Sequence, residues 1–346
     1  MYQSLFQKTG RFYKANLHNH STFSDGQETP EEIKAIYRED SYEIVAFTDH
    51  NVIVPHPELS DEHFLALTGT EYDFNQPKEG KPYSFWKTYH MLLIAPTEDP
   101  GVYPYANPSY VWGGARKHIQ PYYTGDAPHD YRVESVNAMI KDAHEKGFLT
   151  VYCHPAWSQQ RYPDYCGIKG ADFIEVHNSG CVTEGYFLDH SDHVFQDLLM
   201  LGEFPCPAAT DDGHFMTNYC GGWTMVKADS LSYADVFDSL KRGEVYASWG
   251  PSINDIQYDP DRMTLRASSP DAVSCALNSE RRFSEMLHKA PDRDTAYFAF
   301  DLSNYIADTL EYGSDTPAFV RLTLADEKGR KAYSKAYRVD ELLKMK

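Results

Sequence analysis

The stretch NLHNHSTFSDG, residues 16–26, places His18 and His20 one residue apart and Asp25 five residues after them. Side chains two positions apart in a strand point to the same face, so both imidazoles can be directed at one point. With 15 histidines in the chain, chance alone produces roughly 0.6 His-x-His pairs. The stretch therefore predicts a metal site only if other segments supply further ligands.

Five apolar runs in the first 250 residues each end in histidines or carboxylates. The runs are YKANLH (ending in His18, then His20), EIVAFTDHN (Asp49 and His50), FLALTGTEY (Glu71), FLTVYCHP (His154) and CPAATDDGH (Asp211, Asp212 and His214). Helical patterns such as PEEIKAIYRED and VESVNAMIKDAHEKG lie between them, which predicts an α/β fold with parallel βα units. Because functional groups gather at the carboxyl ends of parallel strands, we expect these side chains to converge.

The apolar pattern divides the chain into two predicted domains. Residues 1–252 carry the alternating strands and helices, and residues 253–346 hold alternating stretches such as TAYFAFDL that are typical of a small β-rich domain. Residues 96–131 are rich in Pro, Tyr and Gly and show no periodicity. A connection of this length is typical of a lid or a binding loop, and a plain surface excursion is the alternative.

The composition excludes several classes of partner. A formal net charge of −19 repels phosphate backbones, so a long nucleic acid is not expected to bind. No apolar run approaches the roughly 20 residues of a membrane span. The N-terminal residues lack the layout of a signal peptide, and the six cysteines have no repeating spacing, so we expect free thiols in a cytoplasmic protein. A small anionic substrate remains compatible if bound cations neutralise its site.

The predicted ligand types suit a hydrolytic metal site. Imidazole and carboxylate groups bind Zn, Mn or Fe. A glutamate can bridge two ions, and two ions about 3.5–4 Å apart can lower the pKa of a shared water molecule. Strand-end ligands of this kind therefore predict a hydrolase.

Two further histidines relate to this pattern in different ways. His90 begins the run YHMLLIA, and periodicity alone predicts a strand-edge histidine. His177 ends its run in IEVHNSG and could protonate a leaving group or bind a phosphate. A hydrogen-bonded structural histidine is the alternative for His177.

The ordered motifs LHNHSTFSDG, FTDHN, TGTEYD, CHP and TDDGH resemble those of the PHP superfamily of metal-dependent phosphoesterases, over about residues 12–250. The resemblance implies a distorted (β/α)7 barrel with two or three divalent ions. It implies one ion at His18, His20, the bridging Glu71 and Asp212, a second at Asp25, His50 and His214, and a third at Glu71, His90 and His154. Asp25 stands where many relatives carry histidine, and Asp212 is preferred to Asp211 because it keeps the Asp-x-His spacing.

Other residues receive roles with alternatives. Glu71, Asp25 and His177 are predicted to be catalytic. Asp49 either orients His50 or belongs to a turn. The cations Arg116, Lys117 and Arg161, with His118, could hold an anionic group or lie on the surface. The Tyr-rich loop 96–131 could stack a base or an aromatic leaving group, and packing in the core or on the surface is the alternative.

The leading functional hypothesis is a phosphoesterase that acts on a small phosphorylated metabolite or nucleotide, with hydroxide held between metal ions as the nucleophile. The segment LKRGEVYASWGPSI and the β-rich end resemble a subgroup that includes carbamate and ester hydrolases. A carbamate, ester or amide hydrolase with the same metal site is therefore the second hypothesis. A non-catalytic, metal-binding regulatory module is the third, and the nearly complete ligand set argues against it. The sequence leaves the oligomeric state open.

Overall fold

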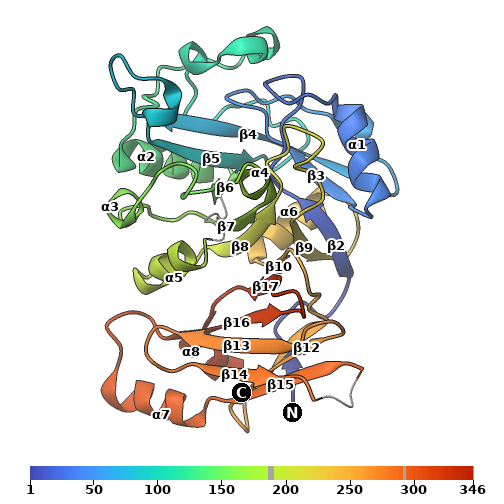
Figure 1. Ribbon diagram of the computed structural model, residues 1–346, viewed down its shortest axis with the longest axis vertical. Helices are drawn as coiled ribbons and strands as arrows, with labels where there is room; N and C mark the ends of the chain where they lie inside the picture. The colour runs from blue at the N-terminus through green and yellow to red at the C-terminus, as the bar shows by residue number, and fades with distance from the viewer. Residues whose placement is uncertain (186–190, 291–293, 346) are drawn as a thin grey trace.

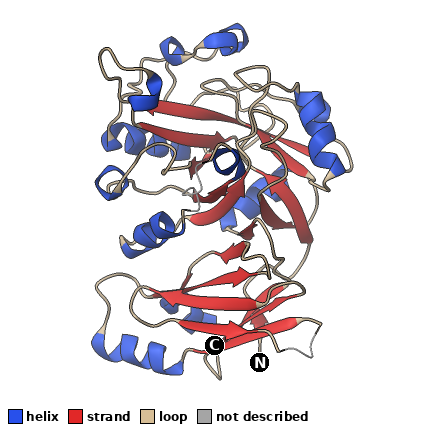
Figure 2. Ribbon diagram, viewed as in Figure 1, coloured by secondary structure: helices blue, strands red, loops and turns tan. Residues whose placement is uncertain are grey.

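The computed structural model of the chain describes residues 1–185, 191–290 and 294–345. Figure 1 shows an upper part, in which a curved sheet is flanked by helices, and a lower part built mainly of strands. The upper part comprises residues 11–248, and the lower part comprises residues 3–6 together with residues 255–345. Figure 2 shows most of the helices around the outside of the upper strands.

Nine strands form the sheet of the upper part. They are β2 (Arg11–Asn16), β3 (Ile44–Phe47), β4 (Leu65–Asn75), β5 (Thr88–Ile94), β6 (Leu149–Tyr152), β7 (Phe173–Asn178), β8 (Cys206–Thr210), β9 (Trp223–Ala228) and β10 (Val245–Ser248). The predicted parallel arrangement holds for β2, β3 and β4 and again for β6, β7 and β8. It is wrong for β5, which lies antiparallel between β4 and β6, and for β9, which is antiparallel to β2 and β10. The sheet is therefore mixed.

The closed barrel that the resemblance implies is not confirmed, because the described strands follow an open path that ends at β8. The edge strand β8 nevertheless returns to the side of β9. There the hydroxyl of Thr224 donates a hydrogen bond to the carbonyl of Ala209 and accepts one from its N–H, both at 3.1 Å. Because a side chain makes these bonds and no backbone ladder does, the upper sheet is curved without closing.

The predicted helices begin and end close to the expected residues. The helix α1 (Pro30–Glu39) starts with a capping box between Thr29 and Glu32 and buries Ile33 and Tyr37 against the sheet. The pattern VESVNAMIKDAHEKG forms α2 (Val133–Glu145), and YADVFDSLKRGE forms α6 (Tyr233–Arg242). The remaining helices are α3 (Tyr162–Tyr165), α4 (Ser179–Thr183), α5 (Asp192–Met200), α7 (Ser303–Tyr312) and α8 (Val339–Leu342). None of the helices in the described ranges combines the length and the apolarity that crossing a membrane requires.

The lower part is rich in antiparallel strands, as its alternating sequence predicts. Its strands are β1 (Gln3–Ser4), β11 (Asp255–Asp259), β12 (Thr264–Ser269), β13 (Ser274–Ser279), β14 (Glu285–His288), β15 (Ala296–Asp301), β16 (Phe319–Ala325), β17 (Lys331–Ser334) and β18 (Tyr337–Arg338). The strand β17 pairs with β10, so one sheet runs through both parts, and Phe6 and Tyr246 belong to the lower core. The division of the chain at residue 252 into two domains stays a prediction.

The long connection over residues 96–131 contains two short 3₁₀ helices, η3 (Pro108–Tyr110) and η4 (Gly113–His118). It packs Tyr103, Val111 and Tyr123 into the core of the upper part. The connection is thus anchored by apolar side chains along its length, which a plain surface excursion does not require. All six cysteines are free, as predicted.

Candidate metal centre

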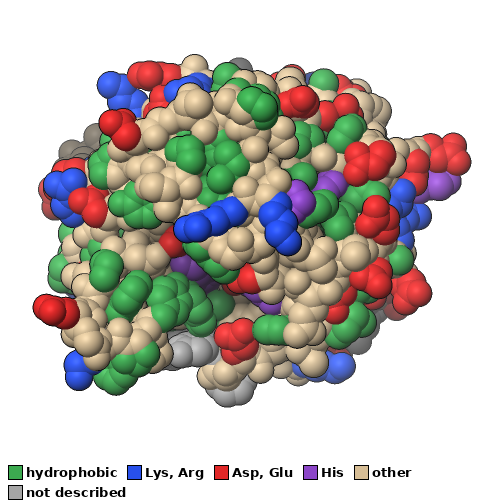
Figure 3. Space-filling view, turned by 90° about the horizontal axis from the view of Figure 1, so that it is seen from above, with side chains coloured by type: hydrophobic (Ala, Val, Ile, Leu, Met, Phe, Trp, Pro, Cys, Tyr) green, Lys and Arg blue, Asp and Glu red, His purple; other side chains and the backbone are tan. Residues whose placement is uncertain are grey.

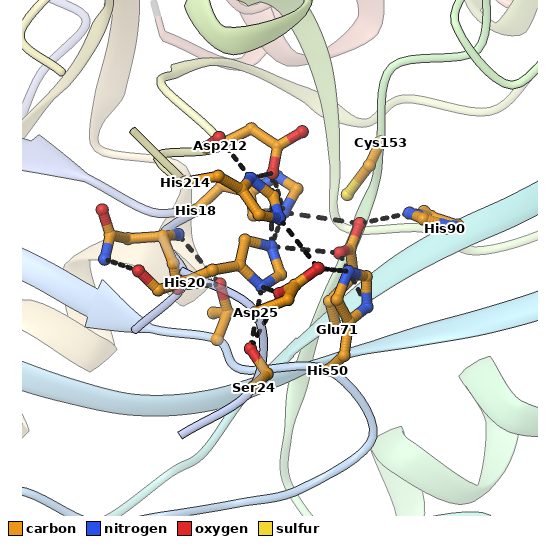
Figure 4. A network of polar contacts seen from close by, with 12 residues as sticks. His18, His20, Ser24, Asp25, His50, Glu71, His90, Cys153, Asp212 and His214 are labelled. Carbon is orange, nitrogen blue, oxygen red and sulfur yellow. Dashed lines mark hydrogen bonds and ion pairs between the residues drawn. The ribbon is translucent and has the colours of Figure 1, made fainter. Parts of the chain in front are cut away.

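The carboxyl edge of the upper sheet brings all nine predicted metal ligands into one cluster, most of which is buried. Figure 4 shows imidazole and carboxylate groups from separate strands and loops that point toward one another. Their donor atoms form three overlapping groups, each within 4.8 Å: His18, His20, Glu71 and Asp212; His20, Asp25, His50 and His214; and Glu71, His90 and His154. The sets agree with those that the resemblance implies, except that His20 also joins the second group. A fourth group joins His18 to Cys153 and Glu175, which were not predicted as ligands.

The first group has the spacing of a metal site. The Nε2 atoms of His18 and His20 lie 3.1 Å apart, and each lies 3.2 Å from Oδ1 of Asp212. The carboxylate of Glu71 lies 3.4 Å from the Nε2 atom of His18 and 3.2 Å from that of His20. Ligands that surround a tetrahedral ion with bonds of about 2.0–2.1 Å lie roughly 3.3–3.4 Å from one another. The four side chains therefore fit one divalent ion.

Glu175 hydrogen-bonds to the ring nitrogen of His18 that faces away from the cluster. The sequence patterns did not predict this residue. Its Oε1 atom accepts hydrogen bonds from Nδ1 of His18 and from the hydroxyl of Thr210, both at 2.7 Å, and its Oε2 atom accepts one from the N–H of His154 at 2.9 Å. With the hydrogen on Nδ1, the Nε2 atom of His18 presents a lone pair to the cluster. A carboxylate within the buried run FIEVHN was the signal that could have identified Glu175.

The second group lies beside the first and is more open. The carboxylate of Asp25 lies 3.4 Å from Nε2 of His214, 3.6 Å from Nδ1 of His20 and 3.8 Å from Nε2 of His50. The rings of His20 and His214 stack at 4.1 Å. Asp25 is about one-third exposed, whereas His20 is fully buried, so the second group faces the solvent side of the cluster.

The direction of β5 explains the position of His90. Because β5 runs antiparallel to β4, its first residues lie at the edge where neighbouring strands end, and His90 pairs with Asp73. Its Nδ1 atom lies 2.8 Å from Oε1 of Glu71, which is also 3.2 Å from Nε2 of His154. Glu71 itself does not end its strand, because β4 continues to Asn75.

Two of the predicted ligands occupy strained backbone positions. His154 has a φ of 22° and Asp212 has a φ of 50°, in the left-handed region that side chains with a Cβ atom disfavour. Hydrogen bonds hold both residues there: Glu175 accepts from the N–H of His154 at 2.9 Å, and the carbonyl of His18 accepts from the N–H of Asp212 at 3.0 Å. Such strain is concentrated at functional sites, where the surrounding structure enforces it.

The two adjacent aspartates have different surroundings. Asp212 points into the cluster, whereas the carboxylate of Asp211 accepts hydrogen bonds from the N–H groups of Cys220 (2.7 Å), Gly221 (2.9 Å) and Gly222 (2.9 Å). The hydroxyl of Tyr37 donates a fourth bond to Asp211. Burial raises the pKa of Asp211 to about 6, although these donors oppose the shift. Asp211 thus anchors the loop after β8.

Asp49 fixes the loop that carries Asp25. Its carboxylate accepts hydrogen bonds from the N–H groups of Ser21 and Ser24 at 2.9 and 3.0 Å and from their hydroxyls at 2.8 and 2.7 Å. The hydroxyl of Ser24 also lies 3.0 Å from Asp25. These contacts favour the turn interpretation of Asp49 over contact with the ring of His50.

The cluster has the electrostatics of a cation site. Burial lowers the pKa of His20, but the nearby carboxylates of Asp212, Glu71 and Asp25 together outweigh burial and raise the pKa to about 10. Burial also lowers the pKa of His154, but the hydrogen bond to Glu71 and the nearby carboxylates outweigh burial and raise the pKa to about 9. The buried atoms Nδ1 of His50 and Oδ1 of Asp212 have no hydrogen-bond partner among the described residues. Negative potential and unbonded donor atoms at one point suit a divalent ion.

A cavity of about 460 Å³ opens above the cluster. Its walls include aromatic side chains, namely Tyr83, Trp112, Trp157 and Phe215. Figure 3 shows histidines at the bottom of a hollow, with Lys or Arg side chains on the surface beside it, but no Lys or Arg is among the described residues that line the cavity.

The residues predicted to bind substrate do not line this cavity. Arg116 is exposed and donates from Nε to the carbonyl of Val111 at 2.8 Å, and Arg161 is exposed and donates to the carbonyl of Gln160 at 2.8 Å. Lys117 is exposed too, and the ring of His118 packs edge-on against Phe23.

His177 also lies outside the cavity. Its Nε2 atom is 3.0 Å from the hydroxyl of Ser179, and its ring packs against Trp249 in a separate depression that includes Gly221. The geometry therefore gives no support to the predicted role of His177 as a proton donor, and it agrees with the structural alternative.

No family model matches the chain, and no curated protein matches it in sequence. Several solved structures are similar to the chain. A two-domain protein from Bacteroides vulgatus, containing a predicted PHP-like metal-dependent phosphoesterase, is 15% identical and aligns over 96% of this chain and 97% of its own, with a TM-score of 0.44. A protein from Bifidobacterium adolescentis, assigned by prediction as a metal-dependent phosphoesterase, is 16% identical over 68% of this chain and 96% of its own, with a TM-score of 0.38. An amidohydrolase from Chromobacterium violaceum, solved with bound sulfate and no metal, is 15% identical over 67% of this chain and 96% of its own, with a TM-score of 0.37.

Proposed function

We propose that the chain is a metal-dependent hydrolase that acts on phosphoesters. The proposal rests on one observation. Three ligand groups overlap at the base of one cavity, and Glu71 belongs to two of them. A site for a single structural ion has no use for shared ligands, whereas a site for two or three adjacent ions requires them. We assign the nine clustered side chains as the ligands of two or three ions of Mn, Zn or Fe.

When bound, adjacent divalent ions lower the pKa of water and stabilise the negative charge that develops on a transferred phosphoryl group. The protein contributes orientation. Glu175 fixes the tautomer of His18, Asp49 holds the loop of Asp25, and Glu71 stands between His18, His20, His90 and His154. Buried hydrogen-bond partners of this kind fix the orientation of the side chains that bind the metal.

Tyr83 is a cavity residue that can donate a hydrogen bond to a bound group. Its hydroxyl lies 3.4 Å from Nε2 of His90, and the side chain lines the cavity. A phenol is protonated at neutral pH and can donate to a phosphoryl oxygen. We therefore propose that Tyr83, and not Arg116 or Arg161, donates a hydrogen bond to the phosphoryl group, whose charge the ions held by the cluster would neutralise.

The test is a metal reconstitution assay. The purified protein is stripped of metal, reloaded with Mn, Zn or Fe, and assayed by phosphate release from phosphate monoesters and diesters. We expect turnover that depends on added metal and that the Glu71→Gln variant loses. Metal-loaded protein that hydrolyses none of these esters would refute the proposal.

A second candidate, hydrolysis of a carbamate, ester or amide at the same site, is favoured by one observation. The described residues that line the cavity include no Lys or Arg to attract a phosphate dianion. Parallel assays with p-nitrophenyl acetate and an aryl carbamate distinguish the two reactions, because the second candidate requires metal-dependent turnover of these esters in preference to the phosphoesters.

A further inference from the structure

A depression of about 380 Å³ lies where α5 and α7 end, and it shares no described residue with the cavity above the ligand cluster. Three segments line it. The end of α5 contributes Met200, the turn after β13 contributes Glu280 and Arg281, and the end of α7 with the following loop contributes residues 312–316. We call it the α5–α7 depression. The proposed hydrolysis uses none of these residues.

Glu280 supplies a buried carboxylate to the α5–α7 depression. The residue is 6% exposed, and its Oε2 atom accepts hydrogen bonds from the hydroxyl of Tyr305 and from the N–H of Phe319 (3.2 Å). The other oxygen, Oε1, accepts no hydrogen bond from the described residues, and Nη1 of Arg281 lies 3.7 Å away from it. A buried carboxylate oxygen without a donor is uncommon in native structures, so a ligand that carries an N–H group fits this position.

Arg281 supplies a positive charge that is held in place beside Glu280. Its Nη2 atom donates a hydrogen bond to the carbonyl of Tyr305 at 2.7 Å, and its guanidinium lies over the Tyr305 ring at 4.3 Å. The ring of Tyr305 is itself stacked on that of Phe283 at 4.7 Å. A guanidinium has five N–H donors, and among the described residues only the carbonyl of Tyr305 accepts from this one. The remaining donors can bind a carboxylate through two hydrogen bonds, as arginine favours.

The rest of the α5–α7 depression combines apolar surface with negative charge. Met200, the last residue of α5, is 37% exposed, and Tyr312, the last residue of α7, is 77% exposed. Exposed apolar side chains beside a depression mark a surface that binds an apolar group. The carboxyl end of α7, where the helix dipole is negative, and the exposed carboxylate of Asp315 attract a cation.

From these groups we infer that the α5–α7 depression binds a free α-amino acid with an apolar side chain. The carboxylate of the amino acid binds Arg281, its ammonium group binds Glu280, and its side chain packs against Met200 and Tyr312. An α-amino acid carries both charges on one carbon atom, which suits two opposite charges that lie 3.7 Å apart in the protein. A peptide separates its terminal charges and does not fit in this way. The inference goes beyond the proposed function, because it requires neither metal nor hydrolysis.

The experiment measures binding of amino acids to the full chain by calorimetry. The probes are leucine, glycine, which lacks an apolar side chain, and N-acetylleucine and leucine amide, which each lack one charge. We expect the Kd of leucine to be about tenfold lower than that of glycine, because its side chain is removed from water. Loss of either charge is expected to raise the Kd about tenfold or more. The titration is repeated after metal removal, because an amino acid can also bind to a metal ion, and binding of leucine at this depression persists without metal.

Variants locate the binding in the α5–α7 depression. Arg281→Met and Glu280→Gln are expected to raise the Kd of leucine about tenfold or more. Arg282→Met is the matched control, because Arg282 is the next residue, is exposed and does not line the depression.

Met200→Ala removes an exposed side chain, so the variant should fold, and it is expected to weaken leucine binding and to leave glycine binding unchanged. The inference is overturned if leucine does not bind at concentrations up to about 10 mM, if its binding is lost with the metal, or if Arg281→Met and Met200→Ala both retain the parent affinity. None of these results bears on phosphoester hydrolysis.

Discussion

The carboxylate of Glu175 accepts a hydrogen bond of 2.7 Å from Nδ1 of His18, and both side chains are fully buried. The contact joins β7 to the segment after β2, two elements that are far apart in the sequence and are brought together at the edge of the upper sheet. Of the two ring nitrogens of His18, Nε2 is then the one that faces His20, Glu71 and Asp212. The orientation of His18 in the first ligand group thus depends on a residue that lies outside that group.

Replacement of Glu175 by glutamine is expected to weaken metal binding roughly 10–100-fold, because a neutral amide no longer holds the Nδ1 hydrogen as a carboxylate does. Metal affinity is measured by competition with a chelator of known affinity. Glu311→Gln, an exposed change in α7, is the matched control and should retain the parent affinity. Unchanged affinity in Glu175→Gln would show that the contact with His18 has no part in metal binding.

Glu71→Gln is expected to remove bound metal and to reduce turnover by about 100-fold or more, a larger effect than that of a supporting residue. Glu71 lies in two ligand groups, so its loss affects more than one ion. Metal content per chain is measured by elemental analysis beside the activity. The exposed Glu98→Gln change serves as the control. Full metal content in Glu71→Gln would contradict the assignment of Glu71 as a shared ligand.

Variants of the two adjacent aspartates should have different effects: one should lower stability, and the other should weaken metal binding. Asp211→Ala leaves the N–H groups of Cys220, Gly221 and Gly222 without their acceptor and is expected to lower the free energy of unfolding by about 3 kcal/mol. Asp212→Asn is expected to reduce metal content and to cost little stability when variant and parent are both compared in the metal-free state. Urea unfolding and metal analysis of both variants provide the comparison. A stable, metal-poor Asp211→Ala protein would reverse the two assignments.

Metal removal should lower thermal stability. A ligand that binds only the folded state at 100 times its Kd stabilises that state by about 2.7 kcal/mol. For a chain of 346 residues such a change corresponds to a shift in Tm of roughly 3–5 °C. Calorimetry with and without a chelator measures the shift, and restoring Mn or Zn should reverse it. A Tm that does not respond to chelator, in protein shown to have lost its metal, would contradict ion binding at this buried cluster.

Much of the candidate site could be predicted from local patterns. Apolar runs that end in His or carboxylate residues predicted the edge at which these groups converge, and the spacing Asp-x-His favoured Asp212, which points into the cluster, over Asp211. The motif order predicted a resemblance to PHP-type proteins, and one solved structure to which the chain is similar contains a predicted PHP-like phosphoesterase. The helices α1 and α2 followed from caps and periodicity, which act within a few residues.

The sequence by itself determined which residues could serve as ligands and on which strand face each one lies, because a period of two or 3.6 residues is a local property of the chain. Only the tertiary structure decided the direction of β5, and with it the place of His90, because strand pairing depends on contacts between distant segments. It also decided that the upper sheet stays open, that Glu175 supports His18, that His177 lies elsewhere, and that Trp112 reaches the cavity wall. Each of these outcomes follows from burial against residues far away in the sequence, which no short pattern records.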